Sequence, residues 1–199
     1  MRILFWGTPD FAVPPLRALL GEGHDVIGVV TRADVPRGRS RSLLDPSSVK
    51  VVALAEGIPV LQPDKPKGDE FLAEMRALEP DVSVVVAYGR ILPQAVIDLP
   101  TLGTLNIHGS ILPALRGAAP LQAAILQGLE ETGVTIMQMV YALDAGPMLQ
   151  RRQNRRKRTS ALHLQRQGQV REHIPQRTKR SEQNSFGRHE RLLSIPFAA

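Results

Sequence analysis

Three polar side chains are the part of this chain best suited to chemistry. Asn106 and His108 stand two positions apart, and Asp144 follows in a Leu-Asp-Ala-Gly run. An amide and an imidazole can donate hydrogen bonds to an oxyanion, and an imidazole beside a carboxylate can move protons. Around one carbonyl group, these side chains suit acyl transfer to an amine, provided that the fold brings them together.

Each of the three also has an ordinary structural interpretation. A histidine at the end of a strand is often structural, and Asn106 could cap the turn that follows it. Asp144 precedes Ala145-Gly146, a place where Asp commonly begins a turn. The chemistry therefore depends on the elements that position these residues.

Apolar runs and amphipathic segments alternate along the first part of the chain. Strands are expected at the short apolar or β-branched runs, residues 3–6, 26–30, 60–61, 81–87, 104–107 and 134–139. Helices are expected at residues 13–20, 45–56, 69–78, 93–97 and 120–126, and a polar loop at 32–44. This order predicts an α/β, Rossmann-like fold with a mainly parallel sheet and helices on both of its faces.

The expected fold places the polar residues at an edge where ligands bind. In open parallel sheets, ligands bind beyond the carboxyl ends of the strands. The strand at 104–107 delivers His108 to that edge, and residues 88–92 follow the strand at 81–87. Gly7-Thr8-Pro9-Asp10 follows the first strand, but it is not the glycine pattern of dinucleotide-binding folds, so no nicotinamide or flavin is expected.

Charge is divided unevenly between the two parts of the chain. Residues 1–150 hold 12 Lys and Arg and 16 Asp and Glu, a net charge of −4, whereas residues 151–199 hold 13 and 3, a net charge of +10. The run from Arg151 to Arg158 has no apolar residue, and the remainder shows no sustained period. We therefore expect a globular domain at 1–150 and a basic, disordered tail at 151–199.

Composition excludes several classes of protein. There is no cysteine, so disulfides, thiolate catalysis and cysteine-based zinc sites are excluded, and no metal is expected. The longest apolar run, from Val82 to Tyr88 with one serine, is far shorter than the roughly 20 residues of a membrane span. A soluble, cytoplasmic and monomeric protein is expected.

Several motifs in order resemble the formyltetrahydrofolate-dependent formyltransferase family, and within it the members that act on methionyl-tRNA. The runs that carry the resemblance are FWGTPDFA (5–12), VVVAYG (84–89), ILP (91–93), NIHGSILP (106–113), RGAAP (116–120), ETGVTIM (131–137) and LDAG (143–146). The resemblance implies transfer of a formyl group from 10-formyltetrahydrofolate to the methionine amine of initiator methionyl-tRNA. It implies Asn106, His108 and Asp144 as the catalytic residues.

The resemblance also implies binding residues. The folate would contact Ser110, Ile111, Leu112 and Pro113 on one wall, and Tyr88, Gly89, Ile91 and Leu92 on the other. A rigid loop and a strand-to-helix turn, both packed on the core, are the alternatives for these segments. The loop at 32–44 would approach the tRNA with Arg37, Arg39 and Arg41, since the planar guanidinium group suits phosphate oxygens. Its alternative is a solvated surface loop.

The resemblance ends near residue 150. The further strand and helix of the family's catalytic domain, and its C-terminal β-barrel, are not visible in residues 151–199, whose composition resembles the translation of a shifted reading frame. Impaired activity is therefore expected. Two other functions stay open: an inactive remnant whose basic tail binds nucleic acid, and a formyltransferase for a small amine such as a nucleotide sugar or purine precursor.

Overall fold

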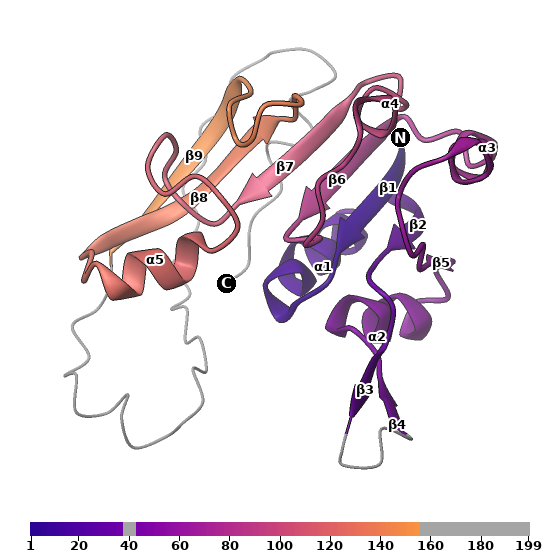
Figure 1. Cartoon of the computed structure of the whole chain (residues 1–199), viewed down its shortest axis with the longest axis horizontal. Coiled ribbons are helices and arrows are strands. Elements are labelled where there is room, and N and C mark those ends of the chain that lie inside the picture. The colour runs from indigo at the N-terminus through magenta and orange to yellow at the C-terminus, as the bar shows by residue number, and fades with distance from the viewer. Residues whose placement is uncertain (38–42, 156–199) are drawn as a thin grey trace.

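The computed structural model of this chain describes residues 1–37 and 43–155. Its main element is a seven-stranded sheet with the order β5-β2-β1-β6-β7-β8-β9 (Figure 1). The strands are β1 (Arg2–Gly7), β2 (Asp25–Val30), β5 (Val60–Leu61), β6 (Val82–Val86), β7 (Thr104–His108), β8 (Glu131–Gln138) and β9 (Met148–Arg155). Strands β5, β2, β1, β6 and β7 run parallel, and β8 and β9 pair antiparallel at one edge. The expected mainly parallel sheet is confirmed.

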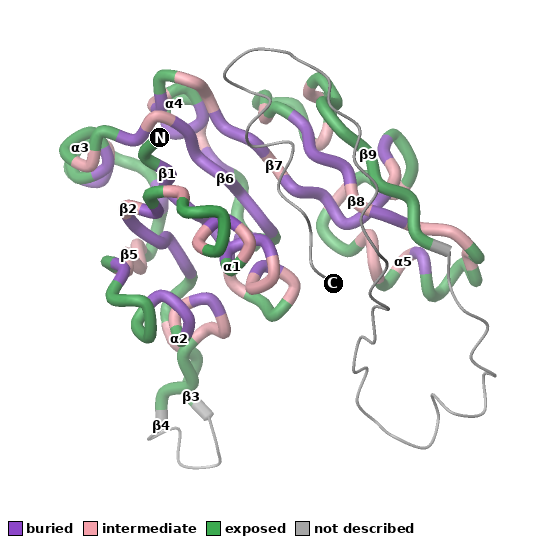
Figure 2. Tube along the Cα trace, turned by 180° about the vertical axis from the view of Figure 1, so that it is seen from behind, coloured by how far each residue is buried: buried purple, intermediate pink, exposed green. Residues whose placement is uncertain are grey.

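Helices cover both faces of the parallel part of the sheet. They are α1 (Val13–Gly21), which follows a short 3-10 turn, η1 (Asp10–Ala12), then α2 (Ser48–Ala55), α3 (Asp69–Ala77) and α4 (Gln94–Ile97). Helix α5 (Pro120–Leu126) lies toward the antiparallel edge, beside β8 (Figure 1). Helices α1 and α2 contribute to the apolar core on one face, together with Ile3 and Phe5 of β1. Helices α3 and α4 contribute to a second core on the other face, with Leu4 and Trp6 of β1. Strands β1 and β6 are buried on both faces, and their sequences are accordingly apolar except for Arg2 at the start of β1 and Ser83 in β6 (Figure 2).

The second core is built around one indole ring. Trp6 is fully buried and makes edge-on contacts with Phe71 at 6.1 Å and Tyr88 at 5.2 Å between ring centroids. Its Nε1–H donates to the hydroxyl of Ser83 on β6, 3.2 Å away. The serine in the otherwise apolar run of β6 therefore satisfies the one polar group of the buried indole.

The segment expected as a polar loop contains a two-stranded antiparallel hairpin. Strands β3 (Val35–Arg37) and β4 (Leu43–Asp45) pair Val35 with Asp45, and the hairpin projects away from the sheet below α2 (Figure 1). This pairing corrects the expected start of the following helix, because Asp45 belongs to β4 and does not cap α2. Ser47 caps the helix instead, and its hydroxyl accepts the backbone N–H of Lys50 at 3.1 Å.

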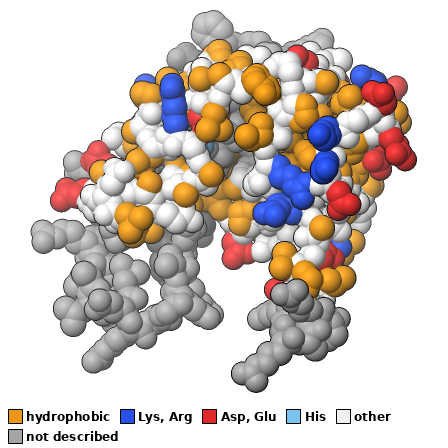
Figure 3. Space-filling view, in the orientation of Figure 1, with side chains coloured by type: hydrophobic (Ala, Val, Ile, Leu, Met, Phe, Trp, Pro, Cys, Tyr) orange, Lys and Arg blue, Asp and Glu red, His pale blue; other side chains and the backbone are white. Residues whose placement is uncertain are grey.

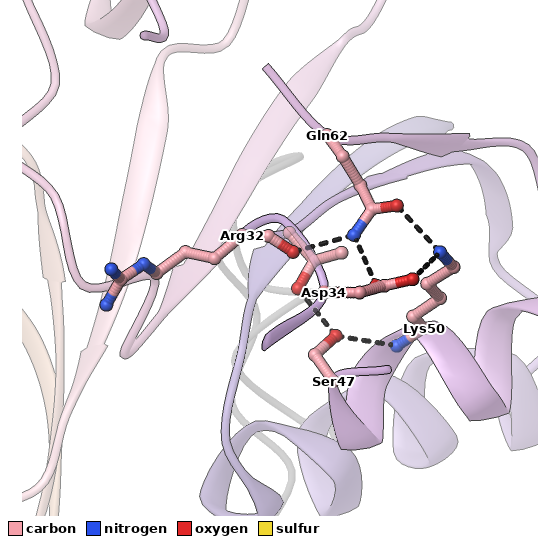
Figure 4. A network of polar contacts seen from close by, with 6 residues as sticks. Arg32, Asp34, Ser47, Lys50 and Gln62 are labelled. Carbon is pink, nitrogen blue, oxygen red and sulfur yellow. Dashed lines mark hydrogen bonds and ion pairs between the residues drawn. The ribbon is translucent and has the colours of Figure 1, made fainter. Parts of the chain in front are cut away.

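A polar network holds the stem of this hairpin against the sheet (Figure 4). The Lys50 ammonium donates to the carboxylate of Asp34 at 2.6 Å and to the side-chain oxygen of Gln62 at 2.7 Å. The Gln62 amide in turn donates to Asp34 at 2.8 Å and to the backbone carbonyl of Arg32 at 2.7 Å. Hydrogen bonds from Lys50 and then Gln62 lower the pKa of the Asp34 carboxyl, so its charged form is part of the network.

Strand β9 extends past the boundary expected at residue 150. Residues 151–155, expected to be disordered, pair with β8, with Arg151 opposite Thr135 and Arg155 opposite Glu131. The pairing uses backbone groups, and β9 is an edge strand with exposed side chains along its described positions, so it needs no apolar residue (Figure 2). The tail beyond Arg155 lies outside the described residues.

The Ser83 hydroxyl gives a test of the second core. Ser83→Ala leaves the buried Trp6 N–H without an acceptor, and we expect it to lower the free energy of unfolding by about 1–3 kcal/mol. Urea denaturation followed by the fluorescence of Trp6, the single tryptophan, measures it. Thr101→Ala removes an exposed hydroxyl whose hydrogen bond to the carbonyl of Asp81 is long, at 3.4 Å, and it serves as control with an expected change within about 0.5 kcal/mol. Equal effects of the two substitutions would contradict this role of Ser83.

The Asp34 network gives a test that depends on pH. Because the folded-state pKa of Asp34 is lowered, its contribution is present above the ordinary pKa and is lost as the pH falls through the lowered value. We expect Lys50→Met to reduce hydrogen-exchange protection of the β3 and β4 amides at neutral pH, and the difference from wild type to shrink below about pH 4. Lys67→Met, an exposed lysine outside the network, is the control. A Lys50 effect that is the same at all pH values would contradict the charged network.

Candidate active site

The end of β7 places the first two candidate residues on one face of the sheet. Side chains alternate along a strand, so Asn106 and His108 share a face while Leu105 and Ile107 point into the core that contains α1 and α2. Asn106 lies between Val85 of β6 and Met137 of β8 in the register. Its side-chain amide has no hydrogen-bond partner within residues 1–37 and 43–155, which leaves it able to donate to a ligand.

His108 is buried and has an acceptor beside each ring nitrogen. Its Nε2 lies 3.1 Å from the backbone carbonyl oxygen of Leu115. Because a carbonyl can only accept, Nε2 carries the proton of this hydrogen bond. Its Nδ1 lies 3.7 Å from Oδ2 of Asp144, and the two side chains are only 7% and 8% exposed. The structure thus brings His108 and Asp144 together from segments far apart in the sequence.

The Asp144 carboxylate is held by a backbone amide. The N–H of Gly117 donates to Oδ2 of Asp144 at 2.7 Å, the same oxygen that faces His108. Asp144 itself has a left-handed backbone, with φ of +47°. Gly146, two residues later, lies against β8, where a Cβ atom would overlap the carbonyl of Gln138. The Leu-Asp-Ala-Gly run is therefore a tight loop that presents one carboxylate.

The segment after His108 is fixed by Thr135 of β8. The Thr135 hydroxyl donates to the carbonyl of Ser110 at 2.7 Å and accepts the N–H of Leu112 at 3.0 Å. The Ser110 hydroxyl donates to the carbonyl of Ala114 at 2.6 Å. Leu112 is only 1% exposed, whereas Ile111 is half-buried and Pro113 is exposed. These contacts hold the backbone of the loop and leave few of its expected ligand-binding side chains at the surface.

The candidate folate-binding residues after β6 also include both buried and exposed side chains. Tyr88 and Leu92 are each 2% exposed and belong to the second core, whereas Gly89 is exposed and Ile91 is 77% exposed. Burial raises the pKa of the Tyr88 phenol, and the positive charges of Arg90 and Arg32 partly oppose this. The phenol oxygen is buried without a hydrogen-bond partner among the described residues.

Only one of the three expected RNA-binding arginines lies within the described residues. Arg37 ends β3, while Arg39 and Arg41 lie outside the described residues. Arg32 is exposed, and its guanidinium extends away from the Asp34 network (Figure 4). The position that a Cβ on Gly89 would occupy is 3.4 Å from Cδ of Arg32, so this side chain lies along the turn after β6. Figure 3 shows Lys and Arg side chains gathered on the face above the hairpin stem.

Sequence reasoning missed the backbone groups of the site. The carbonyl of Leu115 and the N–H of Gly117 contact His108 and Asp144, although neither residue was a candidate. The Arg-Gly pair at 116–117 was part of a recognised run, and a glycine after a non-periodic segment is a signal for a positive φ. Nothing in the sequence tells which group that turn would contact.

Known proteins resemble this chain over most of its length. Residues 1–180 match the model of the formyl transferase family. A methionyl-tRNA formyltransferase of Bacillus pumilus is 55% identical over 148 residues, which are 74% of this chain and 46% of that protein. A methionyl-tRNA formyltransferase of Marinobacter nauticus is 57% identical over 149 residues, covering 75% and 48%. The chain thus spans about half the length of the curated relatives that it matches.

Solved structures agree on the fold. A phosphoribosylglycinamide formyltransferase of Bacillus halodurans has a TM-score of 0.65 and 19% identity, with 83% of this chain and 85% of that chain covered. A formyltetrahydrofolate deformylase of Pseudomonas syringae has a TM-score of 0.60 and 22% identity, covering 81% and 53%. Identities this low show a shared fold alone. The family match and the close relatives go further: this chain belongs to the formyl transferase family.

Proposed function

We propose that this chain transfers a formyl group from 10-formyltetrahydrofolate to the amino group of initiator methionyl-tRNA. The observation that carries the proposal is the buried contact of His108 with Asp144 at the carboxyl edge of the parallel sheet, on the strand face that Asn106 shares with His108. The two relatives described above, which are 55% and 57% identical to this chain over 148 and 149 residues, are called methionyl-tRNA formyltransferases. A cytoplasmic location fits this substrate, because translation begins there.

Each of the three side chains has a role in the proposed reaction. The methionine amine forms a bond to the formyl carbon, the bond from that carbon to the folate nitrogen breaks, and negative charge develops meanwhile on the formyl oxygen. Asn106 and His108 donate hydrogen bonds to this oxygen. One proton passes overall from the amine to the folate nitrogen, and His108 with Asp144 is the acid–base pair placed to carry it.

The contact of His108 with Leu115 defines what the substrate must replace. In this structure the Nε2–H is already donated to the Leu115 carbonyl. A formyl oxygen accepting from Nε2 would take the place of that carbonyl, one acceptor for another. The exchange keeps the ring satisfied in both states, which limits its energetic cost.

The folate site is proposed at the turns that follow β6 and β7. The candidates are Tyr88, Gly89, Ile91, Leu92, Ser110, Ile111, Leu112 and Pro113. Among these, exposed Gly89, Ile91 and Pro113 and half-buried Ile111 are available for direct contact. The buried members, such as Tyr88 and Leu112, support these turns from below.

The RNA contact is proposed along the hairpin and the adjacent edge of the sheet. The candidates are Arg37, which ends β3, and Arg39 and Arg41, which lie outside the described residues. The Asp34 network fixes the stem of the hairpin to which β3 belongs. Arg32 and Arg90 are exposed, and no ion pair or hydrogen bond of their guanidinium groups is found in the described part of the chain. Guanidinium groups without a carboxylate partner are suited to phosphate oxygens.

Removal of the imidazole tests the proposed reaction. We expect His108→Ala to lower the rate of formyl transfer to charged initiator tRNA at least ~100-fold, because it removes an oxyanion donor and half of the acid–base pair. His24→Ala, in the turn after α1, is the control and should stay within about twofold of wild type. Transfer that is unaffected by His108→Ala, or that the unmodified chain does not perform, would contradict the proposal.

The same assay distinguishes a small-amine acceptor from charged tRNA. The solved phosphoribosylglycinamide formyltransferases share the fold with this chain at under 25% identity, which does not favour their acceptor. Replacing charged tRNA by an amino-sugar nucleotide or by a glycinamide ribonucleotide should abolish transfer. Faster turnover with either small amine would move the proposal to that acceptor.

A further inference from the structure

The turn formed by residues 115–117 contacts both members of the buried pair. The carbonyl of Leu115 accepts from Nε2 of His108 at 3.1 Å, and the N–H of Gly117 donates to Oδ2 of Asp144 at 2.7 Å. The two contacts come from backbone groups only two residues apart. One turn therefore sets the position of the imidazole and of the carboxylate at the same time.

The Gly117 amide is the closer of the two contacts of Asp144. The separation of Asp144 Oδ2 from His108 Nδ1 is 3.7 Å, too long for a hydrogen bond, whereas the N–H of Gly117 lies at hydrogen-bond distance from the same oxygen. Within the described residues, this is the hydrogen bond that orients the carboxylate. Without it, the side chain could rotate away from the ring while its loop stayed in place.

The backbone of Gly117 explains why glycine is needed there. Its φ is +107°, a conformation that residues with a Cβ atom rarely adopt. No atom lies within 4 Å of the position that a Cβ would occupy, so neighbouring groups do not exclude a side chain. The requirement comes from the backbone conformation of this turn, which also determines where its N–H points.

We propose that Gly117 is a positioning residue for the formyl transfer reaction and acts on it through Asp144. Its left-handed backbone aims one N–H at the carboxylate, and this hydrogen bond holds Asp144 against His108. The inference rests on the proposed function for its effect on rate, but the contact itself is a property of the folded chain. A residue at 117 that moves φ to negative values turns the N–H away, and the carboxylate loses its orientation.

The chain contains a matched control for this substitution. Gly128, in the turn after α5, also has a positive φ, +64°, and a Cβ there would also meet nothing within 4 Å. Its N–H donates to the carbonyl of Ile125 and not to the site. Both Gly117→Ala and Gly128→Ala therefore place a Cβ atom at a positive φ, with the greater strain expected at Gly117, and only the first one affects Asp144.

The test combines each glycine substitution with Asp144→Asn in the full chain. We expect Gly117→Ala to lower kcat roughly 10- to 100-fold with a change in KM below about threefold, because a small misplacement of an acid–base group slows the chemical step. Adding Asp144→Asn to Gly117→Ala should then cost about twofold or less, since both act through one group. In the Gly128→Ala background, Asp144→Asn should retain its full effect.

A spectroscopic measurement examines the contact without the reaction. Asp144→Asn should shift the ¹⁵N signals of the His108 ring, assigned with His108→Gln, in wild type and in Gly128→Ala. In Gly117→Ala the same substitution should shift them by less than half as much. Gly117→Asn should keep more of the shift than Gly117→Ala, because Asn tolerates a positive φ better.

The outcomes separate the two proposals. If the unmodified chain transfers no formyl group, the proposed function fails, and the ring signals still decide the role of Gly117. A full Asp144→Asn shift in the Gly117→Ala background would overturn the positioning role, and so would additive losses of kcat. The same holds if Gly117→Ala and Gly128→Ala reduce the rate equally.

Discussion

One carboxylate oxygen links the turn at residues 115–117 to His108 in the proposed site. Oδ2 of Asp144 accepts the N–H of Gly117 and faces Nδ1 of His108. These residues belong to separate segments, which the antiparallel pairing of β7 with β8 brings to the same end of the sheet. The acid–base chemistry proposed here depends on this convergence, since the carboxylate influences the imidazole only at short range.

The sheet provides the rigidity that this contact requires. Strand β7 lies between β6 and β8, so its backbone is fixed on both sides. Alternation along β7 then divides its side chains, with Leu105 and Ile107 in one core and Asn106 and His108 on the opposite face. The same residues that stabilise the fold by apolar burial therefore determine where the polar groups point. Thr135 of β8 adds a second attachment by bonding the loop that follows His108.

The sequence allowed the parallel sheet and its order of elements to be predicted, because the hydrophobic period carries that information. Asp144 was implied as the partner of His108 only by the resemblance of several ordered motifs to a known family, and the sequence alone did not establish that the two side chains meet. It did not reveal the hairpin at 35–45, since two strands of three residues each are too short to show a distinctive pattern. The strand character of residues 151–155 was also hidden, because an edge strand pairs through its backbone. The roles of Leu115 and Gly117 depend on backbone direction, which residue type indicates only for the glycine.

The carbonyl stretching frequency of a bound formyl group tests the convergence of these residues most directly. Isotope-edited infrared spectra of 10-formylfolate with a ¹³C-labelled formyl carbon, bound to the full chain without any amine acceptor, would report hydrogen bonds to that oxygen. Donation from Asn106 and His108 predicts a lower frequency than in water, with part of the shift lost in Asn106→Ala and part in His108→Ala. A bound frequency that neither substitution changes would show that these side chains do not meet at the formyl oxygen.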